Sequence, residues 1–144
     1  INRAIARSAN GLVSNEARFK VETTLGVFAQ EGCIVGKVYL DCNGNGIQDK
    51  EDGFEPGVGG VRLYTEDGTY MVSDPYGAYS ICGVSAMTHV LKLDKSTLPV
   101  GAKLGISANR NANDPDSIFV DMKFGELHRA DFIINNCLLL NKLF

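Results

Sequence analysis

The stretch VRLYTEDGTYMVSDPYGAYSIC, residues 61–82, contains three short runs rich in β-branched and aromatic residues, separated by two turns. In the first turn, Glu66-Asp67-Gly68, the Asp-Gly pair supplies the positive φ that a tight hairpin needs. In the second, Asp74-Pro75-Tyr76-Gly77, the proline presets φ, and Asp74 is expected to hold the turn by accepting bonds from the backbone. The stretch therefore predicts consecutive short strands joined by tight turns.

The same alternation continues on both sides of this stretch. Further short runs of this kind are IVGKVYL, THVLKL, AKLGIS, SIFVDMK and RADFII, with Gly, Asn and Asp clusters between them. Strands at spacings of about ten residues, without a convincing amphipathic helix, are typical of a sandwich or barrel. We expect an all-β, Greek-key-like β-sandwich of seven to eight strands over residues 33–137. An N-terminal flank at 1–32, with a strand at 17–21 and a linker at 26–32, precedes it, and a tail at 138–144 follows.

Length and composition exclude several classes of protein. The chain has 144 residues, 44% of them hydrophobic, which is enough for one domain with a core and too apolar for a disordered region. No apolar run approaches the roughly 18–20 residues that cross a bilayer, so no membrane insertion is expected. The chain begins at Ile1 rather than Met, and we expect it to be a processed chain or a piece of a longer one.

The acidic residues are concentrated in one segment. Residues 41–55 have a net charge of −4, whereas the whole chain has −3, so the remaining residues have +1. A nucleic acid or an anionic membrane surface requires a basic patch, which argues against both as partners. The acidic segment instead favours a cation.

Within this segment, DCNGNGIQDKED at residues 41–52 has the spacing of a calcium-binding loop. Oxygen-bearing side chains stand at loop positions 1, 3, 5, 9 and 12, with glycine at position 6 for the sharp bend, and a backbone carbonyl is expected at position 7. The predicted Ca²⁺ ligands are Asp41, Asn43, Asn45, the carbonyl of Ile47, Asp49 and Asp52. The simpler alternative is an Asn/Gly-rich turn with acids added for solubility.

Two features depart from the helix–loop–helix calcium site. Position 12 is Asp52 rather than the bidentate glutamate, so Glu51 or Glu55 could complete the coordination. The segment before the loop, residues 35–40, reads as a strand rather than a helix. The sequence therefore predicts a calcium loop set between strands.

The segments GKVYLDCNGNGIQDKEDGFEPGVGGVRLY, SDPYGAYSICGV and LDKSTLP resemble the B-type repeats of bacterial Ser-Asp-repeat surface adhesins. These repeats belong to the collagen-adhesin B, or transthyretin-like, group of β-sandwiches. The resemblance covers about residues 34–100, with Ser73 where threonine is usual. The positions that match the family pattern are Asp41, Asn43, Asn45, Gly46, Asp49, Glu55, Gly57, Val58, Gly60, Val61, Asp74, Gly77 and Tyr79. By family alignment Glu55 closes the calcium loop, whereas by loop spacing Asp52 does.

The resemblance implies a calcium-stabilised structural or spacer module in a large, multi-repeat bacterial surface or secreted protein. Its partners would be neighbouring repeat domains of the same chain and possibly a host or cell-surface ligand. The segment SIFVDMKFGELHRADF and the cysteines are similar to a branch found in Gram-negative bacteria, and SNEARFKVET resembles the closing strand of a preceding repeat.

The four cysteines, Cys33, Cys42, Cys82 and Cys137, form no close pair of the kind that a zinc site uses. We expect two disulfides and an oxidising compartment, with four buried thiols as the alternative. Three connectivities are open. The positions of the predicted strands favour Cys42–Cys82, which would join the loop to the sheet, and Cys33–Cys137, which would join the ends of the domain.

The sequence contains no motif of a serine-hydrolase elbow, a P-loop, a zinc protease or a dinucleotide site, so no catalysis is expected. His89 and His128 have no partner at ligand spacing and read as structural. The alternative function is an adhesive or carbohydrate-binding module on the same scaffold. Its exposed aromatic residues would come from Tyr64, Tyr70, Tyr76 and Tyr79.

Overall fold

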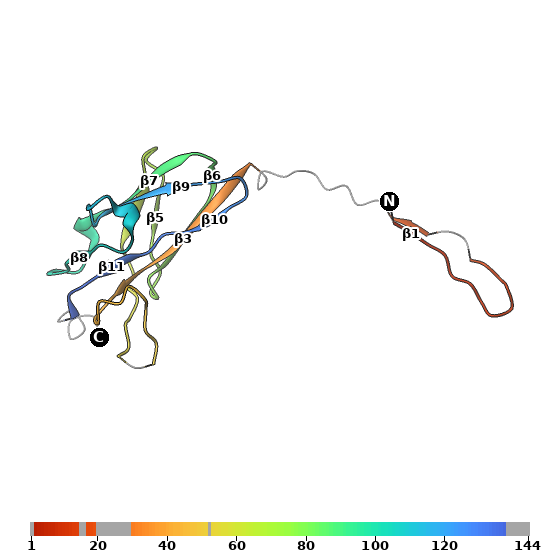
Figure 1. Ribbon diagram of the computed structural model, residues 1–144, viewed down its shortest axis with the longest axis horizontal. Coiled ribbons are helices and arrows are strands. Elements are labelled where there is room, and N and C mark those ends of the chain that lie inside the picture. Colours follow the sequence, from red (N-terminus) through yellow and green to blue (C-terminus); the bar gives the residue numbers. More distant parts are fainter. Residues whose placement is uncertain (1, 15–16, 20–29, 52, 138–144) are drawn as a thin grey trace.

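The computed structural model describes residues 2–14, 17–19, 30–51 and 53–137 (Figure 1). Two short 3₁₀ turns, η2 (Lys95–Thr97) and η3 (Asn109–Asn111), accompany the strands. None of the helical segments in the described ranges is long and apolar enough to cross a membrane. The strands are β1 (Asn2–Ala4), β2 (Ala17–Phe19), β3 (Glu31–Leu40), β4 (Arg62–Thr65), β5 (Tyr70–Val72), β6 (Ala78–Ser85), β7 (Thr88–Leu93), β8 (Leu104–Gly105), β9 (Ser117–Asp121), β10 (Leu127–Arg129) and β11 (Phe132–Ile134).

The strands from β3 onward form two sheets, which confirms the predicted β-sandwich. One sheet has β3 at its centre, with β6 antiparallel on one side and β10 and β11 parallel on the other, and β8 continues from β11. The other sheet has the order β5-β4-β7-β9, all antiparallel. Among the described strands, β1 and β2 pair only with each other.

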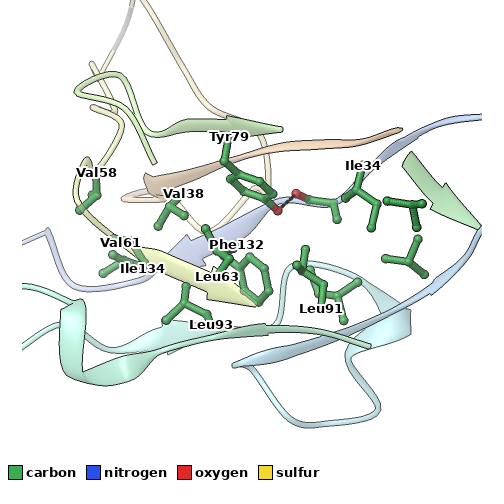
Figure 2. Close-up of a cluster of buried hydrophobic side chains, with 14 of the residues drawn as sticks. Ile34, Val38, Val58, Val61, Leu63, Tyr79, Leu91, Leu93, Phe132 and Ile134 are labelled. Carbon is green, nitrogen blue, oxygen red and sulfur yellow. Dashed lines mark hydrogen bonds between the residues drawn. The ribbon is translucent and has the colours of Figure 1, made fainter. Parts of the chain in front are cut away.

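The period-2 pattern of the strands builds the core between the two sheets (Figure 2). In β3 every second residue is buried up to Val38, and the last three residues are all buried. In β4 and β7 every second residue is buried as well, including all three leucines of these strands. The completely buried apolar side chains come from both sheets: Ile34, Val38, Leu40, Val61, Leu63, Leu91, Val120, Phe132 and Ile134. This burial of aliphatic and aromatic surface is the main stabilising contribution to the fold.

A buried hydrogen bond crosses the β3 sheet where its last strand is interrupted. The residues between β10 and β11 leave the strand geometry, and the carbonyl of Ala130 accepts the hydroxyl proton of Tyr79 (Figure 2). Burial, together with the negative charge of Asp131, raises the pKa of Tyr79 well above its ordinary value, so the hydroxyl remains a donor. The Asp131 carboxylate accepts the backbone N–H of Lys37 at 2.9 Å, which stabilises the same interruption.

Most predicted strands are present, with local differences. The run at residues 102–107 was expected to be one strand, but only β8 forms there. The run at residues 129–134 was expected to be one strand, but it is divided between β10 and β11 because Ala130 and Asp131 make the bonds just described. Residues 31 and 32, assigned to a linker from the sequence, form the start of β3, where they pair with residues 84 and 85 of β6. The predicted strand at 17–21 is seen as β2 over its first three residues, and the rest lies outside the described residues.

All four cysteines form disulfides, as expected, but the predicted pairing is wrong. The bonds are Cys33–Cys82 and Cys42–Cys137. Cys33 lies directly opposite Cys82 on the antiparallel β3–β6 pair. The ends of β3 and β11 lie together because these strands are parallel and in register, which brings Cys42 and Cys137 together just beyond them. The expected Cys33–Cys137 bond would require the start of β3 to meet the end of β11.

Candidate metal centre

The loop that follows β3 projects from one end of the sandwich (Figure 1) and begins with a buried carboxylate. Asp41 is only 2% exposed, and its backbone N–H donates to the carbonyl of Ile134 at 2.9 Å. Its two carboxylate oxygens accept the N–H groups of Gly44 and Gly46 at 2.8 and 2.9 Å. Both glycines have φ of +73°, so the bend that the sequence assigned to position 6 is present. Asp41 therefore joins the loop to the end of the sheet.

Glu55 occupies the other side of the same loop. It is 1% exposed, and its Oε1 accepts the N–H groups of Cys42 and Asn43 at 2.6 and 3.3 Å. Its Oε2 accepts the N–H of Asp49 at 3.0 Å. The Glu55 carboxylate thus lies against the backbone of residues 42–49. Asp52, the alternative acid at position 12, lies outside the described residues.

The remaining predicted ligands converge on Asp49. The side-chain amides of Asn43 and Asn45 both donate to Oδ2 of Asp49, at 2.6 and 3.1 Å. The Asn45 side chain also accepts the N–H of Ile47 at 2.8 Å. The structure therefore gathers Asn43, Asn45 and Asp49, which are two, four and eight residues beyond Asp41, on one side of the curled loop.

These residues have the chemistry of a site for a hard cation. The set offers three carboxylates and two amides, and rotating an asparagine amide by about 180° exchanges its nitrogen for its oxygen. Within the described part of the chain, no Lys, Arg or His nitrogen lies within 4.0 Å of the carboxylates of Asp41, Asp49 or Glu55. No group of three or more His, Cys, Asp or Glu side chains among the described residues is placed to hold a metal ion, so an ion here needs the asparagine oxygens as ligands. In donor type, this mixture of carboxylate and amide oxygens is one that Ca²⁺ prefers.

Tyr39 holds the loop through a hydrogen bond to its backbone, a role that was not predicted from the sequence. This tyrosine is 1% exposed, and its hydroxyl donates to the carbonyl of Gly46 at 2.8 Å. Burial raises the pKa of Tyr39 to about 12, with further contributions from the charges of Asp131 and Asp41, so the hydroxyl keeps its proton at neutral pH. The sequence does contain a signal for this role, which is a tyrosine at the penultimate position of the apolar strand before the loop. A phenol that is buried there usually has a hydrogen-bond partner.

If the loop binds a cation, replacing Tyr39 by phenylalanine should weaken that binding without removing any ligand. The Gly46 carbonyl would lose its donor, and the bend at position 6 would be held less firmly. We expect Tyr39→Phe to lower stability by about 1 kcal/mol and to reduce calcium affinity severalfold in a calorimetric titration. Tyr64→Phe, on the opposite sheet, is the matched control and should leave the affinity unchanged. An unaltered affinity in Tyr39→Phe would contradict this positioning role.

A serine–histidine–glutamate arrangement occurs close to the connection between β6 and β7. Nδ1 of His89 lies 2.5 Å from Oε1 of Glu66, and its Nε2 lies 3.4 Å from the Ser85 hydroxyl. The same Nε2 is only 2.9 Å from the backbone carbonyl of Ser85, which can only accept a hydrogen bond. Nε2 must therefore donate, and it cannot remove a proton from the hydroxyl, as a nucleophilic serine requires. His89 joins β7 to β6, a structural role as expected.

The four tyrosines considered for sugar binding do not gather on one face. Tyr79 is buried in the core, whereas Tyr64 and Tyr70 lie opposite each other on the four-stranded sheet. Tyr76 is 77% exposed and lies in the turn between β5 and β6. In that turn Asp74 accepts the N–H groups of Tyr76 and Ala78, both at 2.9 Å, which confirms its predicted role.

Comparisons with known proteins identify the fold alone. No protein-family model matches the chain, and no curated protein matches it. Among solved structures, the chain is similar to GBS52, the minor pilin of the Gram-positive pathogen Streptococcus agalactiae, with a TM-score of 0.51 and 12% sequence identity. The match covers 74% of this chain and 45% of the pilin chain, so the protein spans less than half the length of that pilin. The shared feature is a pilin-type β-sandwich.

Proposed function

We propose that this protein is a calcium-stabilised structural module of a bacterial surface or secreted protein. The observation that carries the proposal is the loop at residues 41–55. There, the carboxylates of Asp41 and Glu55 are almost completely buried and have no basic partner among the described residues. They lie next to the Asn43–Asn45–Asp49 group. Backbone N–H groups of the loop hydrogen-bond both carboxylates but bring no opposite charge, and a cation beside them would supply it.

The proposed ligands are Asp41, Asn43, Asn45, Asp49, the Ile47 carbonyl and one closing acid. Glu55 is better supported as the closing acid than Asp52, because its carboxylate lies against the loop backbone. Bound calcium would supply positive charge that holds these oxygens together. The loop is in turn joined to the sheet at both ends, through Asp41 to Ile134 and through the carbonyl of Pro56 to Leu40, so ordering the loop stiffens one end of the sandwich.

The disulfides and the fold support a setting outside the cytoplasm for this module. Two disulfides without free cysteines in the described residues suit an oxidising environment outside the cytoplasm. Calcium sites of extracellular modules bind at about 10⁻⁴–10⁻³ M and depend on millimolar calcium outside the cell. A pilin-type sandwich is compatible with a spacer between neighbouring domains. The assignment to Gram-negative bacteria rests on the resemblance of residues 117–132 and of the cysteines, and the similar pilin comes from a Gram-positive organism.

Calcium should raise the thermal midpoint of the protein. At a calcium concentration about ten times the dissociation constant, the folded state gains roughly 1.4 kcal/mol, which corresponds to a rise of about 5 °C for a domain of this size. The measurement is unfolding followed by circular dichroism in EDTA and in millimolar calcium, with metal analysis of the EDTA-treated sample.

The variants Asp49→Asn and Asp41→Ala should remove this calcium-dependent increment, and Asp121→Asn, an exposed acid at the end of β9, should retain it. The increment is the relevant quantity, because Asp41 also accepts two backbone N–H groups and its loss lowers the midpoint even in EDTA. If the midpoint of the metal-free wild-type protein does not respond to calcium, the loop is an Asn/Gly-rich turn without a calcium site.

A further inference from the structure

A hollow of about 460 Å³ lies between the loop at 41–55 and the turn at 74–77. Its walls combine two aromatic rings, two prolines and two lysines: Phe54, Tyr76, Pro56, Pro75, Lys37 and Lys50. A second hollow of about 600 Å³ shares Lys37, Gln48 and Lys50 with the first and extends towards Arg129. Volumes of about 300–1,000 Å³ are typical of small-molecule sites.

The aromatic rings of this hollow are exposed to solvent. Phe54 is 60% and Tyr76 is 77% exposed. The turn around Tyr76 has backbone bonds on both sides, and the two residues that follow Phe54 also make backbone bonds. Single exposed aromatic side chains are common, but two of them bordering one hollow, together with two proline rings, make an apolar surface suited to a ligand.

One of the two cationic groups of the hollow, that of Lys37, is positioned by the loop. Nζ of Lys37 donates to Oε1 of Gln48 at 3.0 Å, and Nε2 of Gln48 donates to the carbonyl of Glu55 at 2.9 Å. Gln48 is thus held at both ends of its amide and fixes the half-buried ammonium group of Lys37. The side-chain ammonium group of neither Lys37 nor Lys50 lies within 4.0 Å of a carboxylate among the described residues.

Two acids of the loop beside the hollow turn their carboxylates away from it. The carboxylate of Glu55 is turned into the loop, where it accepts three backbone N–H groups, and that of Asp49 faces the two asparagines. The hollow therefore presents positive charge beside aromatic surface, despite the negative net charge of the surrounding segment.

The backbone around the hollow is already paired. The carbonyl of Pro56 accepts from Leu40, the carbonyl of Gly77 accepts from Val38, and Val58 donates to the carbonyl of Val38. An extended peptide that adds itself to a sheet edge would find no free backbone partners at these positions. Recognition has to use the side chains, which favours a ring-shaped ligand with an apolar face and a negative charge.

We propose that this hollow binds a glycan whose terminal sugar carries a carboxylate, with the sugar ring stacked on Tyr76 and Phe54 and the carboxylate paired with Lys37 and Lys50. Gln48 acts as a positioning residue for the Lys37 ammonium group. This inference goes beyond the structural role proposed above and uses none of the calcium ligands as a contact to the sugar.

The test is a titration of the full chain in millimolar calcium, followed by two-dimensional NMR, with two matched pairs of probes. These are glucuronate against glucose and sialyllactose against lactose. At least one carboxylated probe should bind about tenfold or more tightly than its neutral counterpart, with amide shifts at residues 37, 48 and 76. The affinity should fall severalfold between about 50 and about 300 mM salt, because the ion pairs are at the surface.

Two pairs of variants locate the binding. Tyr76→Ala and Lys37→Met should each weaken the carboxylated probe about tenfold. Two controls should leave the affinity for that probe unchanged. They are Tyr70→Ala, at a tyrosine of the four-stranded sheet that is 65% exposed, and Lys103→Met. Equal affinity for charged and neutral probes, no binding of either, or a loss that Tyr70→Ala reproduces would each overturn the proposal. Because calcium-dependent stability is measured separately by unfolding, a negative result here leaves the structural role intact.

Discussion

Gly36→Ala should be among the most destabilising single substitutions in this protein. A Cβ atom at position 36 would lie 1.6 Å from the carbonyl oxygen of Ala130 and 2.6 Å from the Tyr79 hydroxyl. The first of these is backbone and cannot rotate away, so either β3 or the segment between β10 and β11 must move. Such a movement also breaks the Tyr79–Ala130 hydrogen bond, and the combined loss should be about 4 kcal/mol. Denaturant unfolding at fixed calcium measures it.

Two controls separate the clash from the general effects of replacing glycine. Gly68→Ala, in a turn with φ of +86° and no atom within 4 Å of the added Cβ, should lose only about 1–2 kcal/mol from the backbone strain. Tyr79→Phe alone should lose about 1–2 kcal/mol, and the Gly36→Ala/Tyr79→Phe double variant should lose less than the sum of the two, because both remove the same hydrogen bond. Additive losses would show that the glycine and the tyrosine act independently.

Removing the Cys42–Cys137 disulfide should have an effect of similar size, and it should also affect the proposed calcium loop at residues 41–55. The bond closes a segment with a sequence separation of 95, for which loop-closure entropy gives about 4.7 kcal/mol. It also connects loop position 2 to the segment after β11, next to the Asp41–Ile134 hydrogen bond. We expect the Cys42→Ser/Cys137→Ser variant to lose about 4 kcal/mol and to bind calcium severalfold more weakly.

The second disulfide provides the comparison. Cys33→Ser/Cys82→Ser removes a bond of sequence separation 49 between neighbouring strands, away from the loop. It should lower the free energy of unfolding by about 4 kcal/mol but leave calcium affinity in the folded protein unchanged. Peptide mapping of the unreduced chain should yield the two linked pairs directly. Equal loss of affinity in both variants would show that the calcium loop responds to global stability rather than to its own covalent link.

The elements that local patterns encode were predicted well from the sequence. Alternating apolar residues and the turns at 66–68 and 74–77 lie close to one another along the chain, so they determine β4, β5 and β6 with little help from the rest of the fold. The spacing of Asp41, Asn43, Asn45, Gly46 and Asp49 is local in the same sense, because the curl of one loop brings these residues together. The all-β class follows from the repetition of these signals.

The tertiary structure decided which distant residues meet. The sequence indicated that Cys33, Cys42, Cys82 and Cys137 are oxidised, but their pairing depends on β11 lying parallel to β3, and no local pattern records the direction in which two remote strands pair. The same holds for the Tyr39 support beneath Gly46 and for the hollow in which Lys37 and Gln48 meet Tyr76. Side-chain period and turn chemistry act over a few residues, whereas these contacts arise only when the two sheets have closed over a common core.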